Sequence, residues 1–263
     1  MNRLVGKLAL VTGASAGIGE ACVRRFAAEG VDVAMWARRT DRLERLAEEL
    51  AREHGVAVHR AEVDVRDRDA VAGAVDALIA GPGVPHILVN NAGLAAGLDR
   101  VQEGSFEDWD RMIDTNVRGL LNVTRLVLPA MIEAGRGHVI NIGSTAGHQV
   151  YPKGNVYNAT KYAVTALTEA INLDVAGTPI RVSSVDPGFV ETEFSLVRFH
   201  GDADRASGVY QGFQPLSGDD VADAVTYIAN LPPHANVLRM VLLPTAQRNV
   251  YVVDRAPADG AGA

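Results

Sequence analysis

The N-terminal residues place a short apolar run, a glycine-rich turn and a helical stretch in direct succession, and this order restricts the fold more than any other feature. The run Leu8–Val11 is followed by glycines with G-x3-G-x-G spacing, and helical spacing extends over residues 18–29. After a strand, Gly13 permits a tight turn, Gly17 lets the backbone approach a pyrophosphate, and Gly19 lets the helix pack close to the strand. The N–H groups at the start of the helix then face the anion. The order therefore predicts a dinucleotide-binding unit rather than a plain turn before a helix.

Apolar runs and helical stretches alternate along the rest of the chain, as they do in parallel sheets with helical crossovers. We expect further strands over residues 31–36, 56–65, 87–90, 138–142, 180–185 and 237–243. We expect further helices over residues 41–54, 67–79, 105–133, 156–175 and 217–231. Seven strands connected in this way predict an α/β, doubly wound Rossmann-type fold with a seven-stranded parallel sheet and helices on both faces. In such sheets, ligands bind at the carboxyl ends of the strands.

The alternation is continuous, so residues 1–253 are expected to form a single dinucleotide-binding and catalytic domain. Residues 189–216 separate the sixth strand from the last helix, and a segment of this length is typical of a lid or a binding loop. The small and polar residues 254–263 are expected to form a disordered tail.

Charge and composition exclude several classes of function. The net charge of −7 provides no basic field for nucleic acid or an anionic membrane. The single cysteine, Cys22, and the seven histidines show no metal-ligand spacing, so no metal site is expected. No apolar run approaches the length of a membrane span, and the N-terminus lacks the core of a signal peptide. We therefore expect a soluble, cytoplasmic protein that binds small molecules, without nucleic-acid or membrane partners.

The end of the second strand indicates which dinucleotide is bound. An NAD site places Asp or Glu there to bind the ribose hydroxyls, whereas a 2′-phosphate requires cations. Arg38 and Arg39 follow Ala37, and no carboxylate stands with them. Guanidinium groups match phosphate oxygens in geometry as well as charge. The alternative, that both arginines merely begin a solvated helix, does not explain why they precede it, so NADP is the expected cofactor.

A tyrosine and a lysine in the helix predicted over residues 156–175 suggest acid–base chemistry. Tyr157 and Lys161 stand four residues apart and therefore on one helix face. A neighbouring ammonium lowers the pKa of a phenol and lets it exchange a proton with an alcohol or carbonyl. Ser144 ends the fifth strand, where its hydroxyl would reach the same substrate oxygen. The spacing alone is common by chance, and the position at the ligand edge of the sheet makes it informative.

Two asparagine sites accompany these residues. Asn91, Ala92 and Gly93 follow the fourth strand, where they either form a turn or line the cofactor site. Asn116 interrupts a long helical pattern among weak helix formers, which suggests a distortion kept for a hydrogen-bonded role.

Taken together, these residues resemble the short-chain dehydrogenase/reductase family over residues 8–245. The resemblance implies that Asn116, Ser144, Tyr157 and Lys161 form a catalytic tetrad. Tyr157 would be the acid/base, Ser144 would steady the substrate oxygen, Lys161 would bind the nicotinamide ribose, and Asn116 would hold a relay water. The cofactor-binding positions that follow are Gly13, Ser15, Gly17, Ile18, Gly19, Arg38, Arg39, Asp64, Val65, Asn91, Ala92, Gly93, Tyr157, Lys161, Pro187, Gly188, Val190 and Thr192.

Residues 193–202 resemble the branch of NADP-dependent 3-hydroxy acid dehydrogenases, which act on serine, allo-threonine, 3-hydroxypropionate or malonic semialdehyde. A small acid needs a partner for its carboxylate, and Arg198 offers a bidentate donor in the lid. Lys153, between Ser144 and Tyr157, is the alternative anchor. Two departures stand out: the stretch before Thr192 is shorter by a glycine, and Ala16 lacks the basic residue of some NADP-dependent relatives.

The resemblance leaves two other functions open. One is an NADPH-dependent reductase of bulkier aldehydes or ketones, and the other is a non-catalytic protein that senses NADP(H). The helical stretches before Glu133 and around Tyr157 resemble those that build four-helix contacts in this family, which implies a homotetramer.

Overall fold

The computed structural model describes residues 2–256 of the 263, and within them it shows the predicted seven-stranded parallel sheet. The strand order is β3-β2-β1-β4-β5-β6-β7, and every neighbouring pair is parallel. Because the winding reverses between β1 and β4, the two halves of the sheet leave a crevice at the carboxyl ends of these strands. The strands are β1 (Leu8–Thr12), β2 (Asp32–Ala37), β3 (Val58–Glu62), β4 (Ile87–Asn90), β5 (Gly137–Ile142), β6 (Ile180–Pro187) and β7 (Arg239–Leu242).

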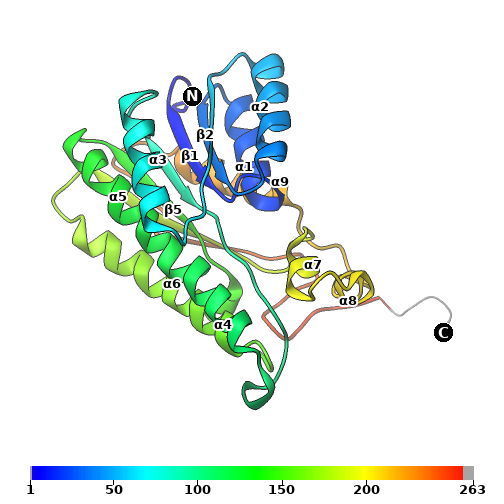
Figure 1. Cartoon of the computed structure of the whole chain (residues 1–263). Helices are drawn as coiled ribbons and strands as arrows, with labels where there is room; N and C mark the ends of the chain where they lie inside the picture. The colour runs from blue at the N-terminus through cyan, green and yellow to red at the C-terminus, as the bar shows by residue number, and fades with distance from the viewer. Residues whose placement is uncertain (1, 257–263) are drawn as a thin grey trace.

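Helices cover both faces of the sheet and leave its central strands buried (Figure 1). One face packs against α1 (Gly17–Ala28), α2 (Thr40–His54) and α9 (Gly218–Ala229). The other packs against α3 (Arg68–Ala80), α5 (Leu120–Glu133) and α6 (Asn155–Asp174). All five residues of β1 are buried, as expected where a parallel strand is covered from both sides.

Side-chain caps set several of the helix starts. Asp67 accepts hydrogen bonds from the N–H groups of Asp69 and Ala70 at the start of α3. Ser217 and Asp220 form a reciprocal capping box at the start of α9. These polar residues satisfy N–H groups that have no partner within the helix, so the boundaries follow from local chemistry.

The helix expected over residues 105–133 is three elements instead of one. α4 (Phe106–Ile113) is followed by a π-helical segment, Asp114–Gly119, and then by α5. The segment places Gly119 so close to Val65 that an added Cβ would lie 2.5 Å from a Val65 methyl carbon. The extra residue of the wider turn therefore lets the backbone pack directly on the loop after β3.

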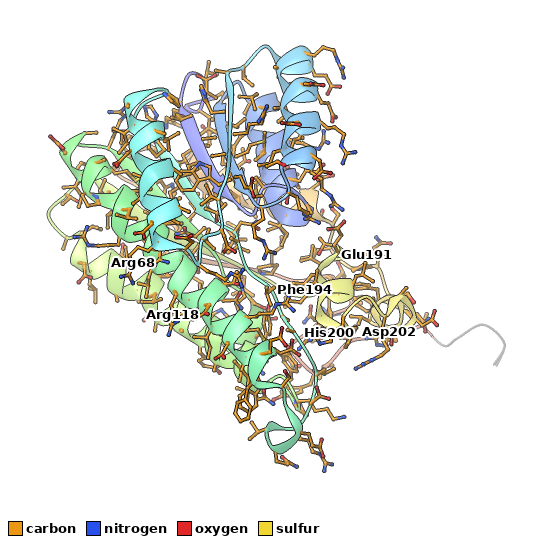
Figure 2. All side chains as sticks on the ribbon, viewed as in Figure 1. Arg68, Arg118, Glu191, Phe194, His200 and Asp202 are labelled. Atoms are coloured by element: carbon orange, nitrogen blue, oxygen red, sulfur yellow. The ribbon has the colours of Figure 1, made fainter. Side chains whose placement is uncertain are left out.

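The segment expected as a lid, residues 189–216, contains two short helices that the sequence pattern did not reveal, α7 (Phe194–Arg198) and α8 (Ala203–Gly208). Figure 2 shows Glu191, Phe194, His200 and Asp202 along this segment at one side of the molecule. A parallel bridge between Val190 and Leu216 closes its base.

Part of the predicted disordered tail is attached to the body of the protein. The N–H of Asp254 donates to the Ala246 carbonyl at 2.8 Å, and the N–H of Ala256 donates to the Gly212 carbonyl at 2.7 Å. Backbone hydrogen bonds thus connect residues 254–256 to the domain, and residues 257–263 of the predicted tail lie outside the described part of the chain.

Candidate active site

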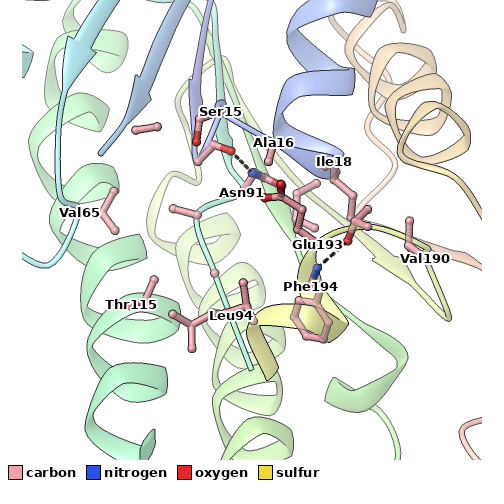
Figure 3. Close-up of a pocket in the computed structure, with 18 of the residues that line it drawn as sticks. Ser15, Ala16, Ile18, Val65, Asn91, Leu94, Thr115, Val190, Glu193 and Phe194 are labelled. Atoms are coloured by element: carbon pink, nitrogen blue, oxygen red, sulfur yellow. Dashed lines mark hydrogen bonds between the residues drawn. The ribbon is translucent and has the colours of Figure 1, made fainter. Parts of the chain in front are cut away.

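A cavity of about 350 Å³ opens at the carboxyl ends of β1, β2, β4, β5 and β6 (Figure 3). Of the residues expected to bind the cofactor, all except Gly19 line it. Gly19 instead packs against the glycine loop, where an added Cβ would lie 2.4 Å from the Gly13 carbonyl oxygen. The crevice predicted from the winding of the sheet is thus the place where these residues meet.

The glycine loop has the backbone shape that a close-packed anion requires. Gly13 and Gly17 adopt left-handed φ angles of 66° and 57°, which side-chain-bearing residues rarely adopt. Gly17 begins α1, whose first N–H groups carry the positive end of the helix dipole. An added Cβ on Gly17 would lie 3.3 Å from Thr192, so this loop also abuts the start of the lid. These residues fit a pyrophosphate.

Asn91 supports the loop and also lines the cavity, so the two roles left open for it coincide. Its side-chain amide donates to the carbonyl oxygens of Thr12 at 2.9 Å and Gly13 at 3.2 Å. The Thr12 hydroxyl in turn accepts from the N–H groups of Asn91 and Ala92. This network ties the turn after β4 to the turn after β1.

Two exposed arginines stand at the end of β2, at the rim of the cavity. Arg39 donates to the Ser15 hydroxyl at 3.1 Å and to the Glu193 carboxylate at 2.8 Å. Asp64, after β3, is paired with Arg66 at 2.6 Å and also lines the cavity. The rim is therefore cationic at the end of β2 and neutralised at the end of β3.

Tyr157 lies buried in the cavity wall, 8% exposed. The Phe194 ring stands edge-on to it at 5.6 Å between centroids, and the Arg198 guanidinium lies over it at 5.4 Å. Burial raises the pKa of Tyr157 above its ordinary value, while the Ser144 hydroxyl and the Arg198 charge act in the opposite direction. The phenol is therefore protonated at neutral pH.

The expectation that Lys161 lowers the pKa of the phenol is not met in this structure. The Lys161 ammonium donates to the Ile142 carbonyl at 2.9 Å and lies 6.0 Å from the centroid of the Tyr157 ring. Burial lowers the pKa of Lys161 to about 8, and the charge of Asp186 opposes that shift. Since desolvation acts on both partners, each charged form is disfavoured, and spacing on a helix could not reveal this.

Ser144 is where the end of β5 was expected to place it, in the cavity wall near Tyr157. Its hydroxyl accepts from the N–H of Ala146 at 3.1 Å, which orients it. Gly143, the residue before it, packs closely against the Asp186 side chain. A Cβ added to Gly143 would lie 1.9 Å from a carboxylate oxygen of Asp186. Glycine is thus required next to the serine.

Asn116 is buried behind the cavity, and the described residues that line the cavity do not include it. Its side-chain oxygen accepts from the N–H of Leu94 at 2.8 Å, and its amide donates to the Leu94 carbonyl and to the Thr160 hydroxyl. The expected distortion is present as the π-helical segment. Asn116 connects it to the loop after β4 and to the helix that carries Tyr157.

The two candidate anchors for a substrate carboxylate, Arg198 and Lys153, differ in their contacts and exposure. Arg198 donates to the Tyr151 hydroxyl at 2.6 Å and stacks over both Tyr151 and Tyr157. Lys153 is exposed and has a left-handed φ of 66°. Both line a small hollow beside the main cavity that Tyr157 also borders, but Arg198 alone of the two contacts Tyr157.

Several residues line the cavity without having been expected there. Thr115 and Gly143 are neighbours of expected residues and could have been found from position alone. Arg111, Glu193, Phe194 and Val197 come from α4 and the lid, whose approach to the sheet no local pattern reveals.

Within residues 2–256, no three His, Cys, Asp or Glu side chains gather as a metal site would require. No helix among those residues has both the length and the apolar character that crossing a membrane demands.

Known proteins share both the sequence and this architecture. A sequence model of the family described as short chain dehydrogenase matches residues 7–201. Sulfoacetaldehyde reductase 2 of Chromohalobacter salexigens is 44% identical over 250 residues, which are 94% of this chain and 98% of the relative. The NADP-dependent 3-hydroxy acid dehydrogenase YdfG of Escherichia coli is 45% identical over 241 residues, covering 91% of this chain and 96% of the relative. A solved structure described as the closed form of serine dehydrogenase complexed with NADP+ superposes with a TM-score of 0.88 at 44% identity, covering 93% of this chain and 98% of that one.

Proposed function

The chain belongs to the short chain dehydrogenase family, and on that premise we propose that it transfers hydride between NADP(H) and the carbinol or carbonyl carbon of a small 3-hydroxy acid. The substrate is of the serine, allo-threonine or 3-hydroxypropionate and malonic semialdehyde type. One observation carries this proposal: the Arg198 guanidinium lies directly over the ring of Tyr157. A cation beside the acid/base is the arrangement that a short substrate with a carboxylate near its reacting carbon requires.

The cofactor is NADP, and the residues of the cavity accommodate it. The glycine loop and the start of α1 would hold the pyrophosphate, and Arg38 and Arg39, at the rim of the same cavity, would hold the 2′-phosphate. Relatives named for NADP and a neighbour solved with NADP+ support this assignment. When bound, the nicotinamide supplies or accepts the hydride, which leaves binding, orientation and proton transfer to the protein.

Tyr157 is the residue that transfers the proton. In the direction of reduction, the protonated phenol donates to the substrate oxygen while the carbonyl carbon gains hydride, and the product is an alcohol. The Ser144 hydroxyl donates to the same oxygen and orients it. In the reverse direction the Tyr157 phenolate accepts the proton of the alcohol and becomes the phenol. Lys161, which also lines the cavity, would bind the nicotinamide ribose. Asn116 completes the tetrad and fixes α6, the helix that carries Tyr157 and Lys161, through its hydrogen bond to Thr160.

Arg198 is the anchor for the substrate carboxylate, and Tyr151 orients it. The same guanidinium suits a sulfonate, and a relative named sulfoacetaldehyde reductase makes an anionic aldehyde of that kind the second candidate substrate. A bulky neutral aldehyde or ketone would leave the half-buried charge of Arg198 without an anionic partner.

The experiment is NADP+ reduction over a panel of 3-hydroxy acids, hydroxy sulfonates and matched neutral alcohols, repeated for Arg198→Ala. We expect KM for the acids to rise about 10- to 100-fold, because a charge-assisted hydrogen bond is lost, while KM for the neutral alcohols changes little. Lys153→Ala is the matched control and should leave both unchanged. An equal effect of Arg198→Ala on acids and alcohols would remove Arg198 as the anchor. A wild-type preference for bulky alcohols would favour the reductase of larger carbonyls.

Tyr157→Phe separates an enzyme from a sensing protein. The variant should still bind NADP and lose hydride transfer by at least about a hundredfold, since the proton donor is removed. If neither the wild type nor the variant oxidises any alcohol of the panel while both bind NADP, the protein is a sensor.

At the level of the whole protein, we propose one catalytic domain over residues 1–253 that works in the cytoplasm as a homotetramer. Exposed apolar side chains on α5 and α6, including Leu121 and Leu173, support contact between copies along these helices. The net charge of −7 supports small-molecule rather than nucleic-acid partners.

A further inference from the structure

The residue that precedes α7, Glu193, is paired with arginines at the cationic rim of the cavity. Glu193 precedes α7, and its two carboxylate oxygens accept separate hydrogen bonds, from Arg39 at 2.8 Å and from Arg42 at 2.8 Å. The two guanidinium groups hold the pKa of Glu193 below its ordinary value, so the carboxylate is charged at neutral pH. One negative charge from the lid is thus shared between two arginines of the segment that follows β2.

The two arginines are not equivalent. Arg39 lines the main cavity beside Ser15 of the glycine loop. Glu193 lines the cavity as well (Figure 3). The described residues that line the cavity do not include Arg42. Arg42 therefore holds Glu193 from outside the cavity, whereas Arg39 holds it at the place where a phosphate on the adenosine ribose would arrive.

Resting on the NADP assignment above, we propose that Glu193 sets the selectivity between phosphorylated and unphosphorylated adenosine by competing with the 2′-phosphate for Arg39. Arg42 limits this competition, because it draws the carboxylate outward and leaves Arg39 more available. Glu193 acts through Arg39 and is a specificity-determining residue.

The far end of α7, at the substrate side of the site, is held independently of Glu193. α7 is five residues long and connects Glu193 to Arg198, with Phe194 against Tyr157 on the way. Its far end is attached by the N–H of Gly97, which donates to the Arg198 carbonyl at 3.0 Å, and by His200, 3.0 Å from Asp108. Displacing Glu193 from Arg39 therefore leaves the substrate end of the lid attached.

The test is binding of 2′,5′-ADP and of 5′-AMP by calorimetry at constant ionic strength, for the wild type, Glu193→Gln, Arg42→Met and the double variant. Glu193→Gln should lower the Kd for 2′,5′-ADP about two- to fivefold, the scale of an exposed ion pair, and leave 5′-AMP unchanged. Arg42→Met should raise the Kd for 2′,5′-ADP by a similar factor, because Glu193 then turns fully to Arg39.

The double variant distinguishes competition from a general effect of charge. Without Glu193, Arg42→Met should have almost no effect on 2′,5′-ADP, whereas simple loss of a distant cation would weaken binding equally in both backgrounds. Glu191→Gln removes an exposed carboxylate two residues away and should change the Kd by less than Glu193→Gln does.

The same measurements distinguish failure of the proposed competition from failure of the NADP assignment. If the wild type prefers 2′,5′-ADP to 5′-AMP but Glu193→Gln leaves that preference unchanged or reduces it, the competition is refuted and the NADP assignment stands. If the wild type shows no preference for 2′,5′-ADP, both are refuted.

Discussion

At the scale of single residues, burial decides the protonation of the two central groups of the site. Tyr157 and Lys161 lie one helical turn apart and are both buried, so desolvation raises the pKa of the phenol and lowers that of the ammonium. Their environment therefore keeps Tyr157 in the protonated form, from which carbonyl reduction starts. The opposing contributions come from Ser144 and Arg198 for the phenol and from Asp186 for the lysine.

The lowered pKa of Lys161 predicts a pH dependence of stability. Its pKa falls from 10.5 to about 8 on folding, so between these values the unfolded chain binds a proton that the folded chain does not. The cost of burying the charge is therefore present below pH 8 and disappears as the pH rises toward 10.5. Relative to Lys161→Met, the wild type should gain stability over this window, on the order of 3 kcal/mol at 1.4 kcal/mol per pKa unit.

Denaturant unfolding of both proteins at pH 7.5 and 10.5 measures this difference. Lys153→Met changes an exposed lysine on the same side of the site and serves as the control. A difference between wild type and Lys161→Met that stays constant with pH would show that Lys161 is not desolvated.

At the scale of elements, one polar side chain holds three segments around the site. Asn116 stands in the π-helical segment, bonds both backbone groups of Leu94 after β4, and reaches Thr160 on α6. Asparagine is a weak helix former, and its presence there is explained by these bonds rather than by the helix. The wider turn is the backbone geometry that lets the segment approach its neighbours.

Asn116→Leu should therefore cost about 2–5 kcal/mol of the free energy of unfolding, because the N–H and carbonyl of Leu94 lose their partner in a buried setting. Denaturant unfolding measures the loss. Asn122→Leu is the matched control on α5, where the amide makes a single bond to the Val65 carbonyl, and should cost about 1 kcal/mol. Equal losses in the two variants would show that the three-segment connection adds nothing.

At the scale of the whole molecule, the residues of the site come from two parts of the chain, the carboxyl ends of the strands and the segment of residues 189–216. The carboxyl ends of the strands supply the glycine loop, Ser144 and the cationic rim. From residues 189–216, Glu193 and Phe194 line the same cavity, and Arg198 lies over the ring of Tyr157. Outside the site, α5 exposes Leu121 and Ile132, and α6 exposes Tyr162 and Leu173, the last of them 73% exposed. Apolar side chains gathered on two helices favour contact with another copy.

Light scattering coupled to sizing chromatography should therefore give four times the mass of one chain. The double variant Leu121→Glu/Leu173→Glu should elute as a smaller species, because burying the introduced carboxylates in an apolar contact is unfavourable. Val101→Glu changes an exposed apolar residue away from these helices and should leave the size unchanged. A tetramer that persists in the double variant would place the contact elsewhere.

The sequence by itself determined the parallel sheet, the crevice at the β1 and β4 ends, the glycine loop, the basic end of β2, and the positions of Tyr157, Lys161 and Ser144. These features follow from local periodicity and from the rule that parallel strands end at one edge, so no distant contact is needed to infer them. Only the tertiary structure decided that Arg198 rather than Lys153 contacts Tyr157, that Glu193 bridges Arg39 and Arg42, and that burial raises the pKa of the phenol. Each of these depends on the lid and the sheet coming together, and desolvation and pairing are properties of the surroundings that residue spacing does not encode.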